Sequence, residues 1–265
     1  MNYILIDGSY FIFYRYHALI MWWKKAKSDQ ELGKPSENKE FVEKFKSTFI
    51  DKIKEMKRKL KIKEAKIMIG RDCSRCNIWR NEFTNSYKGT RINDNDVGFF
   101  FKLVYNEAEN LFIKAGVDNI IYLDNLEADD SIALTTKYIL NKYDDSNVII
   151  ITSDTDYFQL ISERVSLINL KYKPVNNEKN SYGNPDKDLF MKVVLGDKSD
   201  NIQSLFDRCG KKTAEKYYDN KEEFNKRLEN ENKTELYNNN LRLISFNLIP
   251  QELSMKLNKI LDSII

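Results

Sequence analysis

The chain of 265 residues is poor in cysteine, proline and long apolar runs. Its three cysteines are few and odd in number, which is typical of proteins from a reducing compartment without structural disulfides. Cys73 and Cys76 have the spacing of half a zinc knuckle. A closed zinc site needs four ligands, and only Cys209 and His17 remain to complete it, so we expect no zinc at this pair.

The apolar runs are too short for a membrane protein. The longest, residues 10–23, falls below the roughly 20 apolar residues that span a bilayer and contains Arg15 and His17, so it predicts a buried helix. The N-terminus lacks the basic leader and cleavage site of a signal peptide. We therefore expect a cytoplasmic protein without a membrane partner, or a nuclear one in a eukaryote and one of the host cytoplasm in a virus.

Four short apolar runs indicate strands that are buried on both faces of a parallel sheet, because they show no polar alternation. They are Tyr3–Ile6, Lys66–Ile69, Asn119–Leu123 and Val148–Ile151. Between them lie stretches with helical periodicity, namely Phe41–Leu60, Phe99–Ala115 and Ser131–Tyr143. This alternation predicts an α/β fold with a mostly parallel sheet flanked by helices.

The pattern changes near Pro185, after which only helices are predicted. We expect an α/β domain over residues 1–185 and an all-helical lobe over 186–265. The predicted helices of the lobe are Asp186–Leu195, Thr213–Tyr218, Lys221–Leu228, Thr234–Asn247 and Pro250–Ile265. Two polar stretches, Lys24–Asn38 and Asn81–Gly98, are predicted to be mobile.

Acidic residues follow all four predicted strands. A single aspartate in such a place is most often a turn residue or a helix N-cap. Here the carboxyl ends of parallel strands would bring several acids to one rim of the sheet. These acids are Asp7, Asp72, Glu127, Asp129, Asp130, Asp154 and Asp156.

Gathered carboxylates repel one another unless a cation neutralises them, and oxygen ligands suit Mg²⁺ or Mn²⁺. So many acids favour two ions, an arrangement that serves phosphodiester cleavage. A further motif, Gly196 to Asn201, adds Asp197 and Asp200 at the start of the helical lobe. Taken alone, that motif reads as a loop with Asx-turns.

Together these motifs resemble the flap endonuclease or 5′-nuclease family, and most of all its phage-type ribonuclease H branch. The resemblance implies a PIN-like fold and a two-ion Mg²⁺ site, in which Mn²⁺ can substitute. It covers nearly the whole chain and assigns nine carboxylates to the metal site: Asp7, Asp72, Glu127, Asp129, Asp130, Asp154, Asp156, Asp197 and Asp200.

The resemblance also implies a helical arch over about residues 78–98. Within it, Arg80, Lys88 and Arg91 would contact the scissile phosphate, and Tyr87 would contact nucleic acid. On a helix, Lys88 and Arg91 would point the same way. Without the family match, this stretch reads as a solvated basic segment.

After the last acidic motif the family has a helix–three-turn–helix that binds the duplex backbone. Here its hairpin has diverged, and Gly210, Lys211, Lys212 and Thr213 are the recognisable part. The departure puts the K⁺ site of the intact hairpin, and the tightness of duplex binding, in question. The chain has 43 basic against 40 acidic residues, and without the nine site acids the balance is 43 against 31. A basic surface around an acidic pocket suits a protein that grips phosphates.

We therefore expect a Mg²⁺-dependent, monomeric, structure-specific 5′ nuclease that acts on DNA with a 5′ flap, a nick or an RNA primer. Its role would lie in primer removal or repair. The sequence has no evident sliding-clamp motif. Two alternatives remain: a PIN-type ribonuclease acting on structured RNA, and an inactive scaffold that binds nucleic acid.

Overall fold

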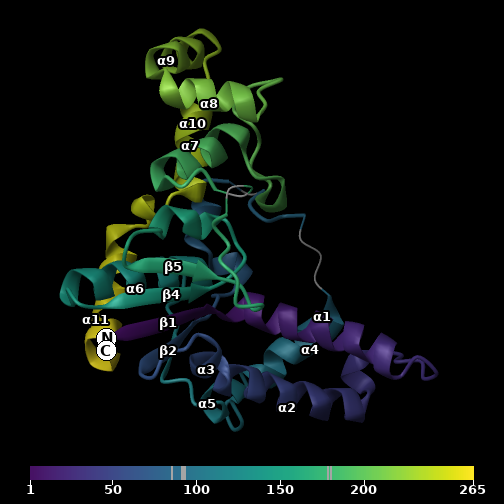
Figure 1. Cartoon of the computed structure of the whole chain (residues 1–265). Coiled ribbons are helices and arrows are strands. Elements are labelled where there is room, and N and C mark those ends of the chain that lie inside the picture. The colour runs from purple at the N-terminus through teal and green to yellow at the C-terminus, as the bar shows by residue number, and fades with distance from the viewer. Residues whose placement is uncertain (85, 91–93, 178, 180) are drawn as a thin grey trace.

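The computed structural model describes residues 1–84, 86–90, 94–177, 179 and 181–265. Its centre is a five-stranded sheet in the order β3-β2-β1-β4-β5. All neighbouring strands are parallel. The strands are β1 (Asn2–Asp7), β2 (Ala65–Gly70), β3 (Asn119–Ile121), β4 (Asn147–Ile151) and β5 (Val165–Ile168). The predicted α/β class with a parallel sheet is confirmed (Figure 1).

The sheet is covered on both faces because successive side chains of a strand point to opposite sides. Ile4 and Ile6 of β1 pack into one hydrophobic core, and Tyr3 and Leu5 pack into the other. The first core is closed by α1 (Gly8–Ala26), α2 (Lys39–Lys54), α3 (Met56–Lys59), α4 (Asn95–Val104) and α5 (Leu111–Lys114). The second is closed by α6 (Ala128–Lys142) and α11 (Gln251–Ile264) (Figure 1).

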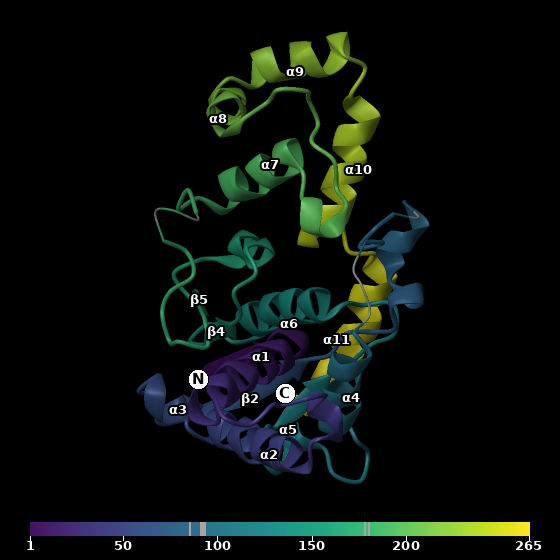
Figure 2. The same ribbon diagram turned by 90° about the vertical axis from the view of Figure 1, so that its right-hand side faces the viewer.

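The remaining helices form a lobe with a small core of its own. They are α7 (Pro185–Leu195), α8 (Lys211–Asp219), α9 (Lys221–Asn230) and α10 (Thr234–Ile244). Aromatic side chains dominate this core, among them Phe190, Phe206 and Phe224. Figure 2 shows that the chain leaves the lobe through α10 and returns along α11 to the body of the molecule. There Leu253, Leu257 and Leu261 of α11 join the core of the sheet.

A fourth apolar cluster connects the lobe to the α/β body. Ile78 and Tyr87 from the segment after β2 pack with Val193 of α7 and with Leu243 and Ile244 of α10. The segment predicted as an arch therefore has its described beginning packed against the lobe.

Several predicted elements differ from the structure. The fifth strand, β5, was not predicted. Phe41–Leu60 is interrupted at Glu55, between α2 and α3, although its apolar face stays buried across the break. Phe99–Ala115 is two helices, because the side chains of Asn106 and Asn110 accept hydrogen bonds from backbone N–H groups and form turns between α4 and α5.

The stretch Lys24–Asn38 holds the end of α1 and a short 3₁₀ helix, Pro35–Glu37. Thr234–Asn247 ends as an α-helix at Ile244, and a 3₁₀ turn, Phe246–Leu248, follows. Within the described part of the chain, no helix combines the length and apolar character needed to cross a bilayer.

Candidate metal centre

The strand ends and the start of α6 bring the first acids together. Asp7 is the last residue of β1 and caps α1, accepting a hydrogen bond from the Tyr10 amide at 2.9 Å. Asp72 follows β2 and accepts at 2.8 Å from the amide of Ala128, the first residue of α6. The hydroxyl of Ser9 donates to the other oxygen of Asp72. The end of β1, the start of α1, the loop after β2 and the start of α6 thereby meet at the carboxyl edge of the sheet.

The N-terminus of α6 carries three acids in a tight group. Glu127, Asp129 and Asp130 each have an oxygen within 4.8 Å of the others. Glu127 is the N-cap, and Asp130 accepts from its amide at 3.2 Å, so the two form a capping box. The partial positive charge of the helix end favours acids at this place.

The electrostatics show that this group continues into the acids of the strands. Burial, the charge of Asp72 and the charges of Asp129 and Asp154 raise the pKa of Asp7 to about 8. Burial and the charge of Asp129 raise the pKa of Glu127 to about 7, although Lys88 and Arg80 oppose the shift. One region of negative charge thus includes acids from β1, the loop after β2, α6 and the loop after β4.

The lobe contributes its acids through Lys192 and Lys88. Lys192 of α7 pairs with Asp156 and with Asp197, the latter at 2.9 Å. Burial acts to raise the pKa of Asp197, but the hydrogen bond from Ser199 and the charge of Lys192 lower it to about 2. Asp200 is buried, and its carboxylate lies 3.8 Å from the ammonium of Lys88.

The Gly196–Asn201 motif is a loop with defined backbone hydrogen bonds. Asp197 and Ile202 form an antiparallel bridge, and Asn201 closes the 3₁₀ turn Lys198–Asp200 in a left-handed conformation. Gly196 has a φ of 73°, and a Cβ at this position would lie 2.5 Å from the Ile202 carbonyl oxygen. Glycine is therefore required where the chain turns to present Asp197 and Asp200.

Arg80 lies beneath the acids. Its side chain is only 1% exposed, and it bonds to Asp130, to Glu127 and to the Leu243 carbonyl of α10. Trp79 donates to Asp130 at 2.9 Å. The family resemblance implied a phosphate contact for Arg80, but its guanidinium is enclosed and orients carboxylates here.

Tyr87 and Lys88 also point inward. Tyr87 is 5% exposed and donates to Glu127 at 3.0 Å, and Lys88 is 8% exposed and donates to the same carboxylate. Lys88 lies in a turn with a φ of 52°, so the expected helix is absent at this residue. The described part of the predicted arch consists of a 3₁₀ turn, Trp79–Glu82, further turns, and the beginning of α4. Arg91 lies outside the described residues.

The predicted duplex-binding residues lie apart from this centre, at the start of α8. Gly210 is the N-cap of this helix, and Lys211 and Lys212 are exposed in its first turn, followed by the half-buried Thr213. The turn presents two lysines and a helix N-terminus on one surface, a combination that suits a phosphate.

The structure thus brings the nine predicted acids into one region through strand ends, α6 and the lobe. The donors are all carboxylate oxygens, which suits hard divalent cations. Burial, and after it the charges of neighbouring acids, raise the pKa values of Asp7 and Glu127, so a bound cation would favour the ionised form of both carboxylates. The residues therefore fit a divalent metal centre.

Sequence reasoning missed the supporting residues Lys192, Trp79 and Ser9. Lys192 lies in a helix five positions before Asp197, and nothing in its neighbourhood marks it as different from other surface lysines. Ser9 directly follows Asp7-Gly8, and its hydroxyl was the only sequence feature that could have indicated a contact with the acids.

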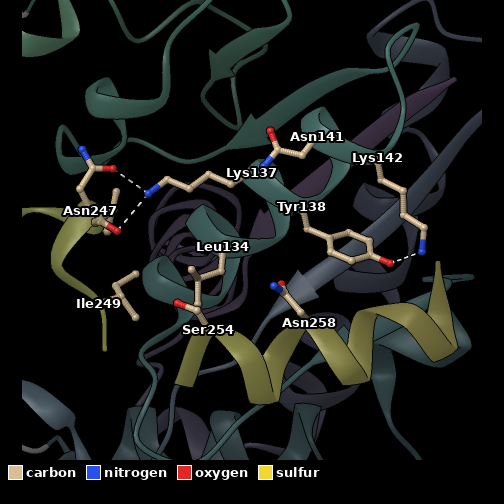
Figure 3. A pocket seen from close by; sticks show the side chains of 10 residues that line it. Leu134, Lys137, Tyr138, Asn141, Lys142, Asn247, Ile249, Ser254 and Asn258 are labelled. Carbon is tan, nitrogen blue, oxygen red and sulfur yellow. Dashed lines mark hydrogen bonds between the residues drawn. The ribbon is translucent and has the colours of Figure 1, made fainter. Parts of the chain in front are cut away.

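A separate hollow of about 550 Å³ lies between α6, the Phe246–Leu248 turn and α11. Figure 3 shows Lys137 reaching across it to Asn247, with Asn141 and Asn258 nearby. None of the ten lining residues is one of the nine acids, so the hollow is distinct from the acidic centre.

Comparison with known proteins gives consistent matches. Residues 2–188 match the family model of the 5′-3′ exonuclease, N-terminal resolvase-like domain. Ribonuclease H of Enterobacteria phage T4 is 29% identical over 212 residues, which are 72% of this chain and 67% of that protein.

Two solved structures share the fold over nearly the full length of both chains. The 5′-exonuclease of bacteriophage T5 with bound zinc ions has a TM-score of 0.69 and 19% identity, covering 100% of this chain and 99% of that one. The bacteriophage T5 flap endonuclease in a pseudo-enzyme–product complex with DNA and metal ions has a TM-score of 0.67 and 17% identity, with the same coverage.

Proposed function

The chain belongs to the 5′-3′ exonuclease family, and from that premise we propose that it is a structure-specific 5′ nuclease. It hydrolyses phosphodiesters of DNA, or of RNA paired with DNA, at 5′ ends and flap junctions. The observation that carries the proposal is the convergence of acids from β1, β2, α6 and β4 with acids of the lobe.

Within this proposal the nine carboxylates form a centre for two Mg²⁺ ions. The ligand oxygens would come from Asp7, Asp72, Glu127, Asp129, Asp130, Asp154, Asp156, Asp197 and Asp200. Bound ions would supply positive charge to the scissile phosphate and its attacking water. That DNA and metal ions accompany the related T5 protein supports this assignment.

The chain's own basic residues would orient the acids and then the substrate. Arg80 holds Asp130 and Glu127 in place through buried hydrogen bonds. Lys88 lies between Glu127 and Asp200, at the junction of body and lobe. We expect the ammonium of Lys88 to bind the scissile phosphate when substrate enters, because it already contacts the Glu127 and Asp200 carboxylates of the proposed metal site.

The duplex next to the cut would rest on the start of α8. Lys211 and Lys212 are exposed there and would neutralise phosphates without reading bases. We expect the protein to act as a monomer, and its role to be primer removal or repair.

The test is cleavage of a 5′-labelled DNA flap in Mg²⁺. Asp154→Asn keeps the shape of the side chain and removes its charge, so we expect the rate to fall by about 100-fold or more, since even outer residues of metal sites contribute 10–100-fold. Asp262→Asn removes an exposed acid of α11 that pairs with Lys142, and serves as the matched control. Equal rates for wild type and Asp154→Asn would overturn the proposal.

A companion substrate series separates DNA from RNA preference. The 5′ flap, a nick, a gap and an RNA-primed end are offered in parallel, together with a structured RNA. Cleavage of the structured RNA alone would replace the proposal with a ribonuclease function.

A further inference from the structure

We propose that Arg71 and Tyr122 form a contact site for the substrate strand beside the acidic centre. The guanidinium of Arg71 binds a backbone phosphate other than the scissile one, and the ring of Tyr122 stacks on a neighbouring unpaired base. The inference rests on the proposed function for its substrate, and it adds a subsite to that function.

The two residues are brought together by the sheet. Arg71 directly follows β2, and its amide donates to the Ile121 carbonyl at 3.0 Å, which continues the pairing of β2 with β3 by one step. Tyr122 directly follows β3. Both side chains therefore leave the same carboxyl edge of the sheet from which Asp72 also projects.

The guanidinium of Arg71 is held by aromatic rings. Its central carbon lies 4.5 Å from the ring centre of Tyr105 and 5.2 Å from that of Tyr122. An arginine at such distances gains cation–π attraction, and its planar donors keep a defined direction.

The charge of Arg71 has no acidic partner among the described residues. The residue is exposed, and no carboxylate of the described ranges lies within ion-pair distance of it. By contrast, Arg80 is paired with Glu127 and Asp130, and Arg227 with Glu231. A fixed, exposed and unpaired guanidinium next to a phosphodiester-cleaving centre suits a phosphate, because its parallel N–H groups match two phosphate oxygens.

Tyr105 ties this pair to the acids. A side chain at Gly8, the residue after Asp7, would collide with the Tyr105 hydroxyl. That hydroxyl is enclosed and has no hydrogen-bond partner within the described part of the protein. The hydroxyl of Tyr105 therefore lies next to Gly8, the neighbour of Asp7, and its ring lies next to the guanidinium of Arg71. This arrangement places the proposed phosphate contact beside the metal centre.

Tyr122 supplies a flat, open surface. Its side chain is 41% exposed, whereas Tyr87 and Tyr157 of the same region are 5% and 0% exposed. Aromatic rings beside a cationic groove bind unpaired bases without sequence preference, at about 1–3 kcal/mol per base. The pair thus matches single-stranded nucleic acid better than a protein partner.

The binding test uses a fluorescent 5′-flap DNA in EDTA, so that no cleavage occurs. We expect Arg71→Gln to weaken binding about tenfold and to reduce the slope of log affinity against log salt by about 0.7–0.9, the contribution of one phosphate. Arg71→Lys should keep the slope and lose part of the affinity. Arg58→Gln removes an exposed guanidinium of α3 and should change neither.

A second measurement identifies the phosphate. Single phosphates of the flap strand are replaced one at a time by uncharged methylphosphonates, and each substrate is measured with wild type and Arg71→Gln. We expect one position, not the scissile one, at which the two losses are not additive, since both changes remove the same contact. Additivity at every position would overturn the phosphate contact.

The outcomes separate this inference from the proposed function. If wild type cleaves the flap and Arg71→Gln binds it equally well, the subsite is wrong and the nuclease assignment stands. If Arg71→Gln loses affinity only together with thermal stability, Arg71 is a structural partner of Tyr105 and the inference fails. Tyr122→Ala should weaken binding of the flap but not of a blunt duplex, and equal loss for both would refute the stacking.

Discussion

Arg80 and Asp130 form a two-point ion pair in which the two terminal guanidinium nitrogens, Nη1 and Nη2, each lie 2.7 Å from a different carboxylate oxygen. Both side chains are buried, Arg80 at 1% exposed and Asp130 at 0%. The pair lies under the acidic centre and connects the start of α6 to α10, since Arg80 also donates to Leu243.

Breaking this pair from one side should destabilise the protein strongly. Arg80→Gln leaves the charge of Asp130 buried without its partner, and such changes cost about 3–5 kcal/mol. Urea unfolding followed by circular dichroism measures the loss. Lys34→Gln, which breaks an exposed pair with Glu37, should cause no measurable change. A loss for Arg80→Gln as small as that of the control would contradict the buried pair.

Gly196→Ala should distort the loop that presents Asp197 and Asp200. The residue has a φ of 73°, and a Cβ would approach the backbone of Ile202 and Gln203. We expect urea unfolding to show a larger loss than the about 1–3 kcal/mol that a strained backbone position alone costs. Gly116 has a φ of 85° with open space around it, so Gly116→Ala reports the backbone strain alone. Equal effects of both substitutions would show that the contacts at Gly196 do not matter.

The metal-free protein should lose stability as the pH rises. Burial and the charge of Asp72 raise the pKa of Asp7 from its ordinary value of 3.8 to about 8 in the folded protein, so the folded state binds this proton more tightly. The stability gained from that proton is complete below about pH 4 and is lost as the pH rises towards 8. Melting temperatures in EDTA from pH 5 to 8.5 should fall more steeply for wild type than for Asp7→Asn. Parallel curves would refute the shift.

Duplex binding should depend on the start of α8. Replacing Lys211 and Lys212 together by Gln should weaken binding to blunt duplex DNA and lower its salt slope by about 1.8, or 0.9 for each phosphate released. The matched control replaces Lys54 and Lys59, two exposed lysines of the α2–α3 region, by Gln. An unchanged salt slope in the α8 variant would remove this turn from the duplex surface.

Lys192 should act as a competitor of metal ions. Its ammonium pairs with Asp156 and Asp197. Lys192→Met frees both carboxylates, and we expect calorimetric titration without DNA to show tighter binding of Mn²⁺, about fivefold for the loss of an ion pair near 1 kcal/mol. Lys187→Met, on the same helix and paired with Asp219, is the control. Weaker metal binding by Lys192→Met would show that the lysine instead organises the acids.

The sequence allowed the sheet to be predicted in outline because its strands are uniformly apolar. The runs at Tyr3–Ile6, Lys66–Ile69 and Val148–Ile151 lie within β1, β2 and β4. The run at Asn119–Leu123 is strand only to Ile121. β5 was not predicted because Val165–Ile168 is short and contains Ser166, a weak signal beside the longer runs.

The convergence of the acids that follow β1, β2 and β4 could be predicted because strand ends of a parallel sheet converge, whereas Asp197 and Asp200 were assigned only through the family resemblance. The orientation of the basic residues could not be predicted, since it depends on packing between distant segments. Tyr87 packs in an apolar cluster with residues of the lobe, among them Val193 and Ile244. No local sequence pattern predicts this packing between distant segments. The family resemblance implied a helix at Lys88, whereas the backbone amide of Lys88 donates to the carbonyl of Asp200.

The contact between Arg80 and Leu243 joins residues 163 positions apart, and that between Thr90 and Asn201 joins residues 111 apart. Contacts over such distances form late, after nearby segments have ordered. While the chain is still being synthesised, most of the nine acids are therefore present before the contact between Arg80 and α10 can form. Arg80 therefore reaches its full set of partners only after α10 has been synthesised and has docked.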